Sequence, residues 1–281
     1  FKIGVDALPD FPKDSTDRNR TSPFAFTGNR FEFRMVGSSE NIACPNHMLN
    51  TIVASELSDI ADKMEKVPAD QFKDALKKLL AEIVKEHKRV IFNGDGYSDA
   101  WVEEAAKRGL PNYKTTADCI PHYADEKNVK LFEKFGIFSK AEIDARVEIL
   151  LESYSKTINI EALTMIDMAK KKYIPACLAY SKELADAIAV KKSIDVCSCV
   201  EKDLVKKVTD ETEKAYDAVQ KLEEVTAVAA AKTCMQEMAN AYRDTVLPVM
   251  DELRKAVDAL EVLLPSTMWP VPAYSEMIFN V

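Results

Sequence analysis

The second half of the chain repeats apolar residues at the spacing of a helix. From Val246 to Leu264, apolar residues recur at intervals of three or four positions and so line one helix face. The same period predicts a second helix over residues 201–244 and a third over residues 140–172, interrupted near Pro175 and resuming after it. Helices of this length that each bury one face are expected to pack as an antiparallel bundle.

Glycine and proline are unevenly distributed, and this divides the chain. All seven glycines lie within the first 136 residues, and the long helical stretch contains only Pro175 and Pro248. Because these residues mark turns and loops, their scarcity predicts long helices with few breaks. We therefore expect two domains, residues 1–120 and residues 121–281.

The first 120 residues show a mixed pattern. It predicts short strands and helices, with strands at residues 1–5 and 29–36 and helices at residues 46–64 and 69–88. A further helix should begin after Ser98, a residue type that caps helix N-termini, and end at Gly109. Together with the bundle, this pattern predicts an α+β fold. Near the other end of the chain, Trp269 and Tyr274 are expected to anchor an extended tail by aromatic burial.

Charged residues alternate with apolar ones in the strand expected at residues 29–36. Arg30, Glu32 and Arg34 would share one face of that strand, because successive side chains point to opposite sides. One interpretation is an exposed face with cross-strand salt bridges. The other is a binding site, since Arg20 lies shortly upstream and guanidinium groups suit carboxylates and phosphates. A phosphate together with a metal cation would balance both signs of charge. The pattern alone leaves both interpretations open.

Composition and charge exclude some classes of function. The 281-residue chain carries a net charge of −8 and has a pI near 5.2, which argues against a nucleic acid as its main ligand. It contains no apolar run of about eighteen residues, so no transmembrane helix is expected. It does not begin with methionine and shows no signal-peptide pattern, and we interpret it as part of a longer subunit.

The six cysteines do not have the spacing of a metal site. No CxxC pair is present, and Cys197 and Cys199 are the only close pair. We interpret these two as reduced thiols near a helix start. In a chain without a secretion signal, this cysteine usage indicates a reducing compartment, so a cytoplasmic location is expected.

Several long stretches resemble one enzyme family. The segment "TDRNRTSPFAFTGNRFEFRMVGSS" is similar to the signature of the type III glutamine synthetases, and "VIFNGDGYSDAWVEEAAKRGLPN" and "MWPVPAY" follow in that family's order. The resemblance extends over essentially the whole chain. It implies the C-terminal part of such a subunit, with the end of the catalytic sheet domain in residues 1–120 and a helical C-terminal domain in residues 121–281.

The resemblance also implies roles for four residues. Arg20 and Arg34 would be the catalytic residues that bind glutamate and the transferring phosphoryl group. Arg20 and Arg30 would contact the nucleotide, and Glu32 would bind a divalent metal, Mg²⁺ or Mn²⁺.

Two positions depart from the commoner types of the family. Ala25 stands where those types have a phosphate-binding arginine, and Thr27 stands where they have a nucleotide-site lysine. Some contacts to ATP are therefore expected to come from other residues.

The implied reaction joins ammonia to the γ-carboxylate of L-glutamate with ATP as co-substrate. The implied assembly is a homo-oligomeric ring, a dodecamer in this family, and the part of the subunit in this chain is expected to be inactive alone. Two alternatives remain. One is a related ligase that joins glutamate to a polyamine or another amine, and the other is a non-catalytic helical assembly module.

Overall fold

The computed structural model describes residues 24–26, 31–33, 41–91 and 98–279. The chain divides into two compact units. Unit 1 comprises residues 1–114 and 127–139, and unit 2 comprises residues 115–126 and 140–281.

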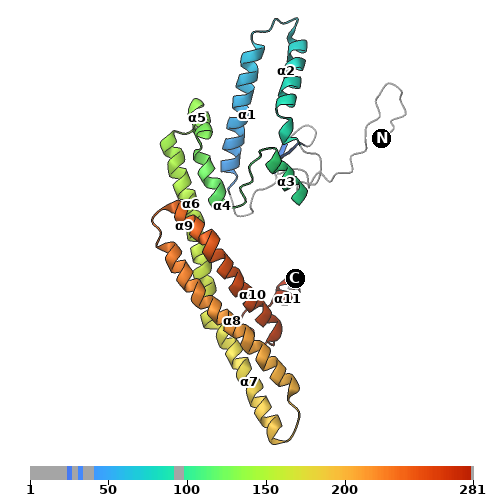
Figure 1. The fold of residues 1–281 in the computed structure, drawn as a ribbon, viewed down its shortest axis with the longest axis vertical. Coiled ribbons are helices and arrows are strands. Elements are labelled where there is room, and N and C mark those ends of the chain that lie inside the picture. Colours follow the sequence, from blue (N-terminus) through green and yellow to red (C-terminus); the bar gives the residue numbers. More distant parts are fainter. Residues whose placement is uncertain (1–23, 27–30, 34–40, 92–97, 280–281) are drawn as a thin grey trace, which may run out of the picture. The chain divides into compact units, whose positions relative to one another are not determined.

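Unit 1 contains a helical hairpin. α1 (Ala43–Met64) and α2 (Phe72–Glu86) contact each other, and the turn between them contains Pro68 (Figure 1). Two further short helices follow, η2 (Lys88–Val90) and α3 (Asp99–Lys107). The helices expected at residues 46–64 and 69–88 are therefore present, and α2 begins three residues later than expected.

α5 (Glu126–Lys134) packs against α1 through aromatic rings. The ring of His47 meets Phe132 and Phe138 edge-on, with centroids 6.0 and 5.2 Å apart. Because Phe132 is buried, these rings form a small core that joins residues distant in the sequence.

Both ends of α3 have the predicted caps. The Ser98 hydroxyl accepts a hydrogen bond from the Trp101 N–H at 3.3 Å, which satisfies a donor at the helix start. At the other end, Gly109 has a φ of +72°, and Leu110 N–H donates to the Ala105 carbonyl at 2.9 Å. A left-handed glycine closing a helix in this way is the C-cap that the sequence predicted.

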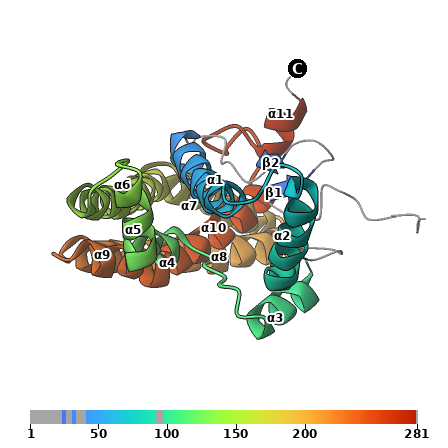
Figure 2. The same ribbon diagram turned by 90° about the horizontal axis from the view of Figure 1, so that it is seen from above.

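Unit 2 is an antiparallel bundle of long helices. α7 and α8 are joined by a short turn and pack along each other, and α10 packs along α8 (Figures 1 and 2). In chain order the elements are α4 (Thr116–Cys119), η3 (Ile120–Ala124), α6 (Lys140–Met168), η4 (Ala169–Tyr173), α7 (Ile174–Ser193), α8 (Cys199–Ala230), α9 (Met235–Ala241), η5 (Tyr242–Val246), α10 (Leu247–Leu263) and α11 (Tyr274–Phe279).

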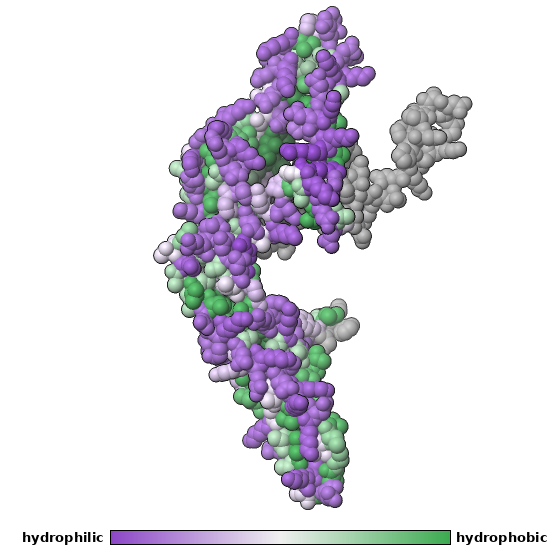
Figure 3. All heavy atoms as spheres, viewed as in Figure 1, coloured by the Kyte–Doolittle hydropathy of each residue, from purple (hydrophilic) through white to green (hydrophobic). Residues whose placement is uncertain are grey.

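The core of unit 2 follows the apolar period of the sequence. From the end of η5 to the residue after α10, the predicted face is buried at Val246, Leu253, Leu260 and Leu264, and the intervening apolar residues pack against the same cluster. α8 contributes buried residues at the same period, among them Leu222. Hydrophilic residues predominate on the face of unit 2 that Figure 3 shows. The bundle predicted from periodicity is confirmed.

Two π-helical turns precede Pro175 and Pro248 in the long helices of unit 2. η4 lies directly before Ile174 and Pro175, and η5 lies directly before Leu247 and Pro248. A proline inside a helix lacks an N–H and clashes with the preceding turn, and widening that turn accommodates it. The interruption expected at Pro175 is thus one wide turn, and helical structure continues on both sides.

The helix expected over residues 201–244 is divided in two. α8 ends at Ala230, and α9 begins at Met235 after a short connection. The connection contains neither glycine nor proline, so the local sequence carries no breaking signal. The reversal allows α10 to pack back along α8, and this tertiary packing overrides local helix propensity.

The prediction of an α+β fold ending a catalytic sheet is wrong for the described residues. Their strands are β1 (Phe24–Phe26) and β2 (Phe31–Phe33), which pair antiparallel as a two-stranded ribbon. The other regular elements in this part of the chain are helical. Of the strand expected at residues 29–36, the structure describes residues 31–33, and these are a strand. Period-two alternation does not determine how many strands join a sheet.

The structure does not test two further expectations. The strand expected at residues 1–5 lies outside the described residues, and the division at residue 120 stays a prediction. Among the helices that the structure describes, none is both long and apolar enough to cross a membrane.

Candidate functional site

The predicted catalytic strand is only partly described. Glu32 lies at the centre of β2, and its backbone partner in the ribbon is Ala25. Arg20, Arg30 and Arg34 lie outside the described residues. The gathering of these four charged side chains therefore stays a prediction.

The register of the ribbon relates two positions singled out in the sequence. Ala25, where the commoner types carry a phosphate-binding arginine, is directly opposite Glu32, the predicted metal ligand. The departure at Ala25 therefore falls at the backbone position paired with the predicted metal ligand.

A carboxylate such as Glu32 is a suitable ligand for Mg²⁺ or Mn²⁺, but one carboxylate is too few. Such ions take about six oxygen ligands. Within the described ranges, no group of three or more histidine, cysteine, aspartate or glutamate side chains could hold a metal ion. The described part of the chain thus does not form a metal site by itself.

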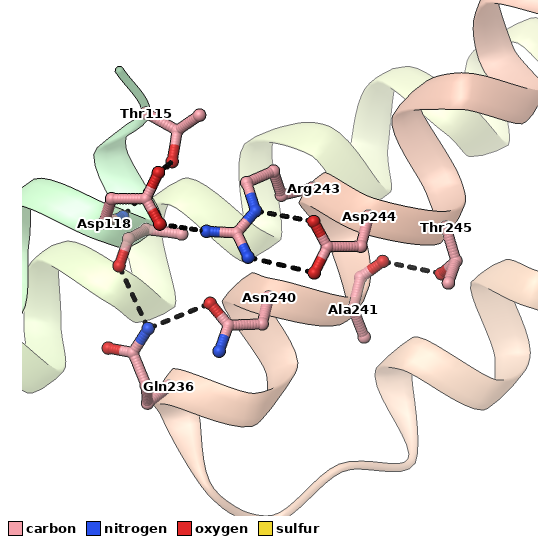
Figure 4. A network of polar contacts seen from close by, with 9 residues as sticks. Thr115, Asp118, Gln236, Asn240, Ala241, Arg243, Asp244 and Thr245 are labelled. Carbon is pink, nitrogen blue, oxygen red and sulfur yellow. Dashed lines mark hydrogen bonds and ion pairs between the residues drawn. The ribbon is translucent and has the colours of Figure 1, made fainter. Parts of the chain in front are cut away.

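Unit 2 contains a polar network centred on Arg243 (Figure 4). The Arg243 guanidinium donates through Nε and Nη2 to the two carboxylate oxygens of Asp244, at 2.7 and 2.9 Å. Its Nη1 donates to Oδ1 of Asp118, whose other oxygen accepts from the Thr115 hydroxyl at 2.7 Å. A side chain of η5 is in this way attached to α4, which lies 125 residues earlier in the chain.

A neighbouring side chain makes a second connection between the same parts of unit 2. Gln236 on α9 donates through Nε2 to the Ala117 carbonyl and to Asn240 Oδ1, both at 3.0 Å (Figure 4). The Ala117 side chain is buried beneath this contact. The network therefore fixes α4 to α9 and η5.

Within the protein, the guanidinium of Arg243 is shared by two carboxylates. The hydrogen bonds that Arg243 donates to Asp244 lower the pKa of Asp244 and raise the pKa of Arg243. Both groups are therefore held in their charged forms. Because Asp118 and Asp244 already accept from the guanidinium, the arrangement serves packing better than ligand binding.

A pocket of about 270 Å³ opens between α6, η4, α10 and the C-terminal segment of unit 2. Its wall is mainly apolar and aromatic, and Trp269 stacks on Tyr173 with ring centroids 5.1 Å apart. The polar side chains of its lining include Arg254 and Asp258, which form an ion pair at 2.8 Å, and Glu261, which accepts from the Tyr274 N–H at 2.9 Å.

Burial changes the acid–base behaviour of this pocket. It raises the pKa of Tyr173 and also that of Glu261, where the charge of Asp258 adds to the effect. The Trp269 indole N–H is buried and has no hydrogen-bond partner within the described structure. Apolar walls with a few polar groups are typical of ligand pockets, although this volume is at the low end of their range, roughly 300 Å³.

The sequence correctly predicted one of two aromatic contacts in the C-terminal segment that lines this pocket. The burial of Trp269 is confirmed, with 7% of the residue exposed. The expectation for Tyr274 is wrong, because it is 44% exposed and begins the short helix α11. The sequence carried no signal for the contact of Asp118 with Arg243, because no local period relates residues so far apart.

Comparisons with known proteins place the chain in a family. Residues 75–192 match the family "Glutamine synthetase C-terminal domain". A glutamine synthetase of Butyrivibrio fibrisolvens is 44% identical over 277 residues, and the type-3 glutamine synthetase of Dictyostelium discoideum is 39% identical over 285 residues. These alignments cover 96% and 99% of the chain.

The chain is a relative of the type 3 glutamine synthetases. The resemblance inferred from the sequence is thereby confirmed. A glutamine synthetase of Bacteroides fragilis is also similar, with 34% identity over 288 residues. The chain spans 39% of the length of the first two glutamine synthetases and 40% of the third.

Proposed function

We propose that the full-length subunit is a glutamine synthetase that ligates ammonia to the γ-carboxylate of L-glutamate with ATP. One observation carries this proposal, namely the similarity to glutamine synthetases from three organisms along almost the whole chain. The subunit would act in the cytoplasm as a homo-oligomeric ring.

The reaction would proceed in two steps. The γ-carboxylate of glutamate attacks the γ-phosphorus of ATP and forms γ-glutamyl phosphate, with ADP as the leaving group. Ammonia then attacks the acyl carbon, and phosphate leaves as glutamine forms. Most of the catalysis of such a transfer comes from positioning and from stabilising the charge in flight.

The arginines of this chain would supply that stabilisation. Arg20 and Arg34 would bind the glutamate carboxylate and the transferring phosphoryl group, because a planar guanidinium can bond two oxygens at once. Arg30 would contact the nucleotide. A group that binds charge more strongly in the transition state than in the ground state raises turnover.

Glu32 would contribute one carboxylate to a divalent cation, Mg²⁺ or Mn²⁺. When bound, such a cation would neutralise phosphate charge. The other ligands would come from residues outside this chain, since the relatives are more than twice as long. For the same reason we expect the 281 residues alone to lack activity.

The experiment that tests this proposal uses the full-length subunit. Phosphate release from ATP in the presence of glutamate should require ammonia, and polyamines or other amines should not replace it. Release with an amine, and none with ammonia, would instead indicate a related γ-glutamyl–amine ligase.

A variant tests the part of the site that lies in this chain. Glu32→Gln should raise the Mg²⁺ or Mn²⁺ concentration needed for half-maximal activity at least about tenfold, because a neutral amide is a poorer ligand for a hard cation. The matched control is Glu104→Gln, which removes a carboxylate of α3 that pairs with Arg108, the residue after the helix. An unchanged metal titration in Glu32→Gln would favour the salt-bridge interpretation of the strand.

A further inference from the structure

Two thiols meet at the turn that joins α7 to α8. The Sγ atoms of Cys197 and Cys199 lie 2.7 Å apart and share a hydrogen bond. Both residues are exposed, so a reagent in solvent can reach them. The proposed ligase reaction uses neither thiol.

The backbone of this turn holds the pair in position. The Val196 N–H donates to the Lys191 carbonyl at 2.9 Å, and Asp195 has a φ of +55°. Aspartate is one of the few non-glycine residues that readily adopt this left-handed conformation. An ion pair between Lys191 and Glu201 also spans the turn, and the Glu201 side chain is only 17% exposed. The conformation before Cys197 is therefore well defined.

The two sulfurs differ in acidity. The hydrogen bond from Cys199 lowers the pKa of the Cys197 thiol, and the nearby Lys202 charge acts in the same direction. The same hydrogen bond raises the pKa of Cys199. Since the thiolate is the reactive form of cysteine, Cys197 is the better nucleophile of the pair.

We propose that Cys197 and Cys199 form a thiol–disulfide exchange site that reacts with small disulfides such as oxidised glutathione. The Cys197 thiolate attacks one sulfur of oxidised glutathione, which breaks its S–S bond and releases one glutathione thiolate. Cys199 then loses its proton to solvent and attacks the Cys197 sulfur, which releases the second glutathione. The two cysteines lose two electrons and two protons in all, and one oxidised glutathione becomes two reduced molecules.

The short spacing makes this bond easy to reverse. Only Ser198 separates the two cysteines, and the stabilisation from a disulfide decreases as the closed loop becomes shorter. The Sγ atoms lie 2.7 Å apart, and a disulfide would bring them to about 2.05 Å. An exposed disulfide of this kind is accessible to reductants, and we expect it to be labile.

Peptide mapping of the 281-residue chain tests the proposal directly. Trypsin cleaves after Lys192 and Lys202, and the peptide of residues 193–202 contains both cysteines and no other. After treatment with oxidised glutathione, alkylation and digestion, this peptide should lack two hydrogens and carry neither an alkyl group nor glutathione. Treatment with dithiothreitol should restore two alkylated thiols.

Single-cysteine variants separate the two steps. Cys199→Ser should stop at a mixed disulfide between Cys197 and glutathione, whereas Cys197→Ser should react at Cys199 several times more slowly. Three other exposed cysteines have no second cysteine close by in the sequence, and they serve as controls in the same digest: Cys44, Cys119 and Cys234. Each of them should stop at a mixed disulfide with glutathione.

Two results would overturn the proposal. One is a peptide of residues 193–202 that remains fully alkylated after a treatment that modifies the control cysteines. The other is a wild-type peptide that retains glutathione as its final product, because the second thiol would then not complete the exchange.

Discussion

Arg243 donates to two carboxylates, one beside it on η5 and one on the distant α4. This fixes its side chain, and the hydrogen bonds to Asp244 lower the pKa of that carboxyl group. The arginines proposed for catalysis need the opposite arrangement, with donors left available for a substrate that carries charge. The same side-chain chemistry can thus stabilise a fold at one position and bind a ligand at another, and the number of internal partners distinguishes the two uses.

Replacing the proposed catalytic arginines by lysine should lower turnover. Arg20→Lys and Arg34→Lys in the full-length subunit should each reduce kcat about a hundredfold, because a point charge cannot replace two parallel hydrogen bonds in the transition state. Steady-state kinetics with varied glutamate provides the measurement. Arg254→Lys, which alters an arginine paired with Asp258 on α10, is the control and should keep kcat. A raised KM with unchanged kcat would contradict the proposed roles.

Glu261 should make the stability of unit 2 depend on pH. Burial raises its pKa, so the folded chain binds this proton more tightly than the unfolded chain does. The resulting stabilisation is present below the ordinary glutamate pKa and is lost as pH rises through the raised value. Glu261→Gln removes the titration but keeps an oxygen that can accept from the Tyr274 N–H. Urea unfolding followed across this range should show a smaller decrease in stability for the variant, and parallel curves would contradict the prediction.

At the scale of elements, helix ends and turns follow local rules where glycine, proline or a capping hydroxyl is present. α3 begins at its serine cap and ends at a left-handed glycine, and Pro175 and Pro248 each follow a π-helical turn. The connection between α8 and α9 has none of these signals and depends on packing. Local chemistry thus defines some boundaries, and contacts between helices define the others.

Substitution of Gly109 should loosen the end of α3. Its φ of +72° is unfavourable for a residue with a Cβ, and nothing lies within 4 Å of the position that a Cβ would take. Gly109→Ala should therefore cost about 1 kcal/mol from backbone strain alone. Gly109→Asn should cost less, because asparagine adopts this conformation more readily. Hydrogen exchange of the α3 amides provides the measurement, and equal exchange in both variants and the wild type would argue against strain at this position.

At the scale of the whole molecule, the C-terminal segment contributes to unit 2 in two different ways. Trp269 is buried against Tyr173 and belongs to the core. α11 follows it and leaves Tyr274, Met277 and Ile278 exposed, the last at 70%. The sequence alone predicted one role for this whole region, and burial separates it into a core segment and a surface segment.

Two truncations should separate these roles. A chain ending after Leu264 loses Trp269, and unit 2 should be destabilised by about 3–5 kcal/mol, the usual cost of removing a buried tryptophan. A chain ending after Ala273 keeps Trp269 and removes mainly exposed side chains, so its stability should change little. Hydrogen exchange of α6 and α10 measures the destabilisation.

The same truncations in the full-length subunit test the expected role of the helical domain in assembly. If α11 is covered by another subunit in the ring, removal of residues after Ala273 should reduce the assembled mass without unfolding unit 2. Light scattering coupled to size-exclusion chromatography measures that mass. A ring of unchanged mass and stability would show that α11 is not needed for assembly.

The sequence by itself determined most of the long helices and the periodic apolar faces that they bury. The apolar period at Leu253 and Leu260 is a local property, since neighbours on one helix face are only three or four residues apart. The caps of α3 follow from single residue types for the same reason. The family resemblance also came from the sequence, because it rests on several long sequence stretches that follow one another in the family's order. It requires no coordinates.

Only the tertiary structure decided which distant residues meet. The reversal after Ala230, the contact between Asp118 and Arg243 and the stacking of Trp269 on Tyr173 join positions that no local pattern relates. The fold class was mispredicted for a similar reason: alternation identifies a strand, but strand pairing depends on non-local contacts. The distance between the Cys197 and Cys199 sulfurs was likewise set by the turn between α7 and α8, whose backbone conformation brings two exposed side chains together.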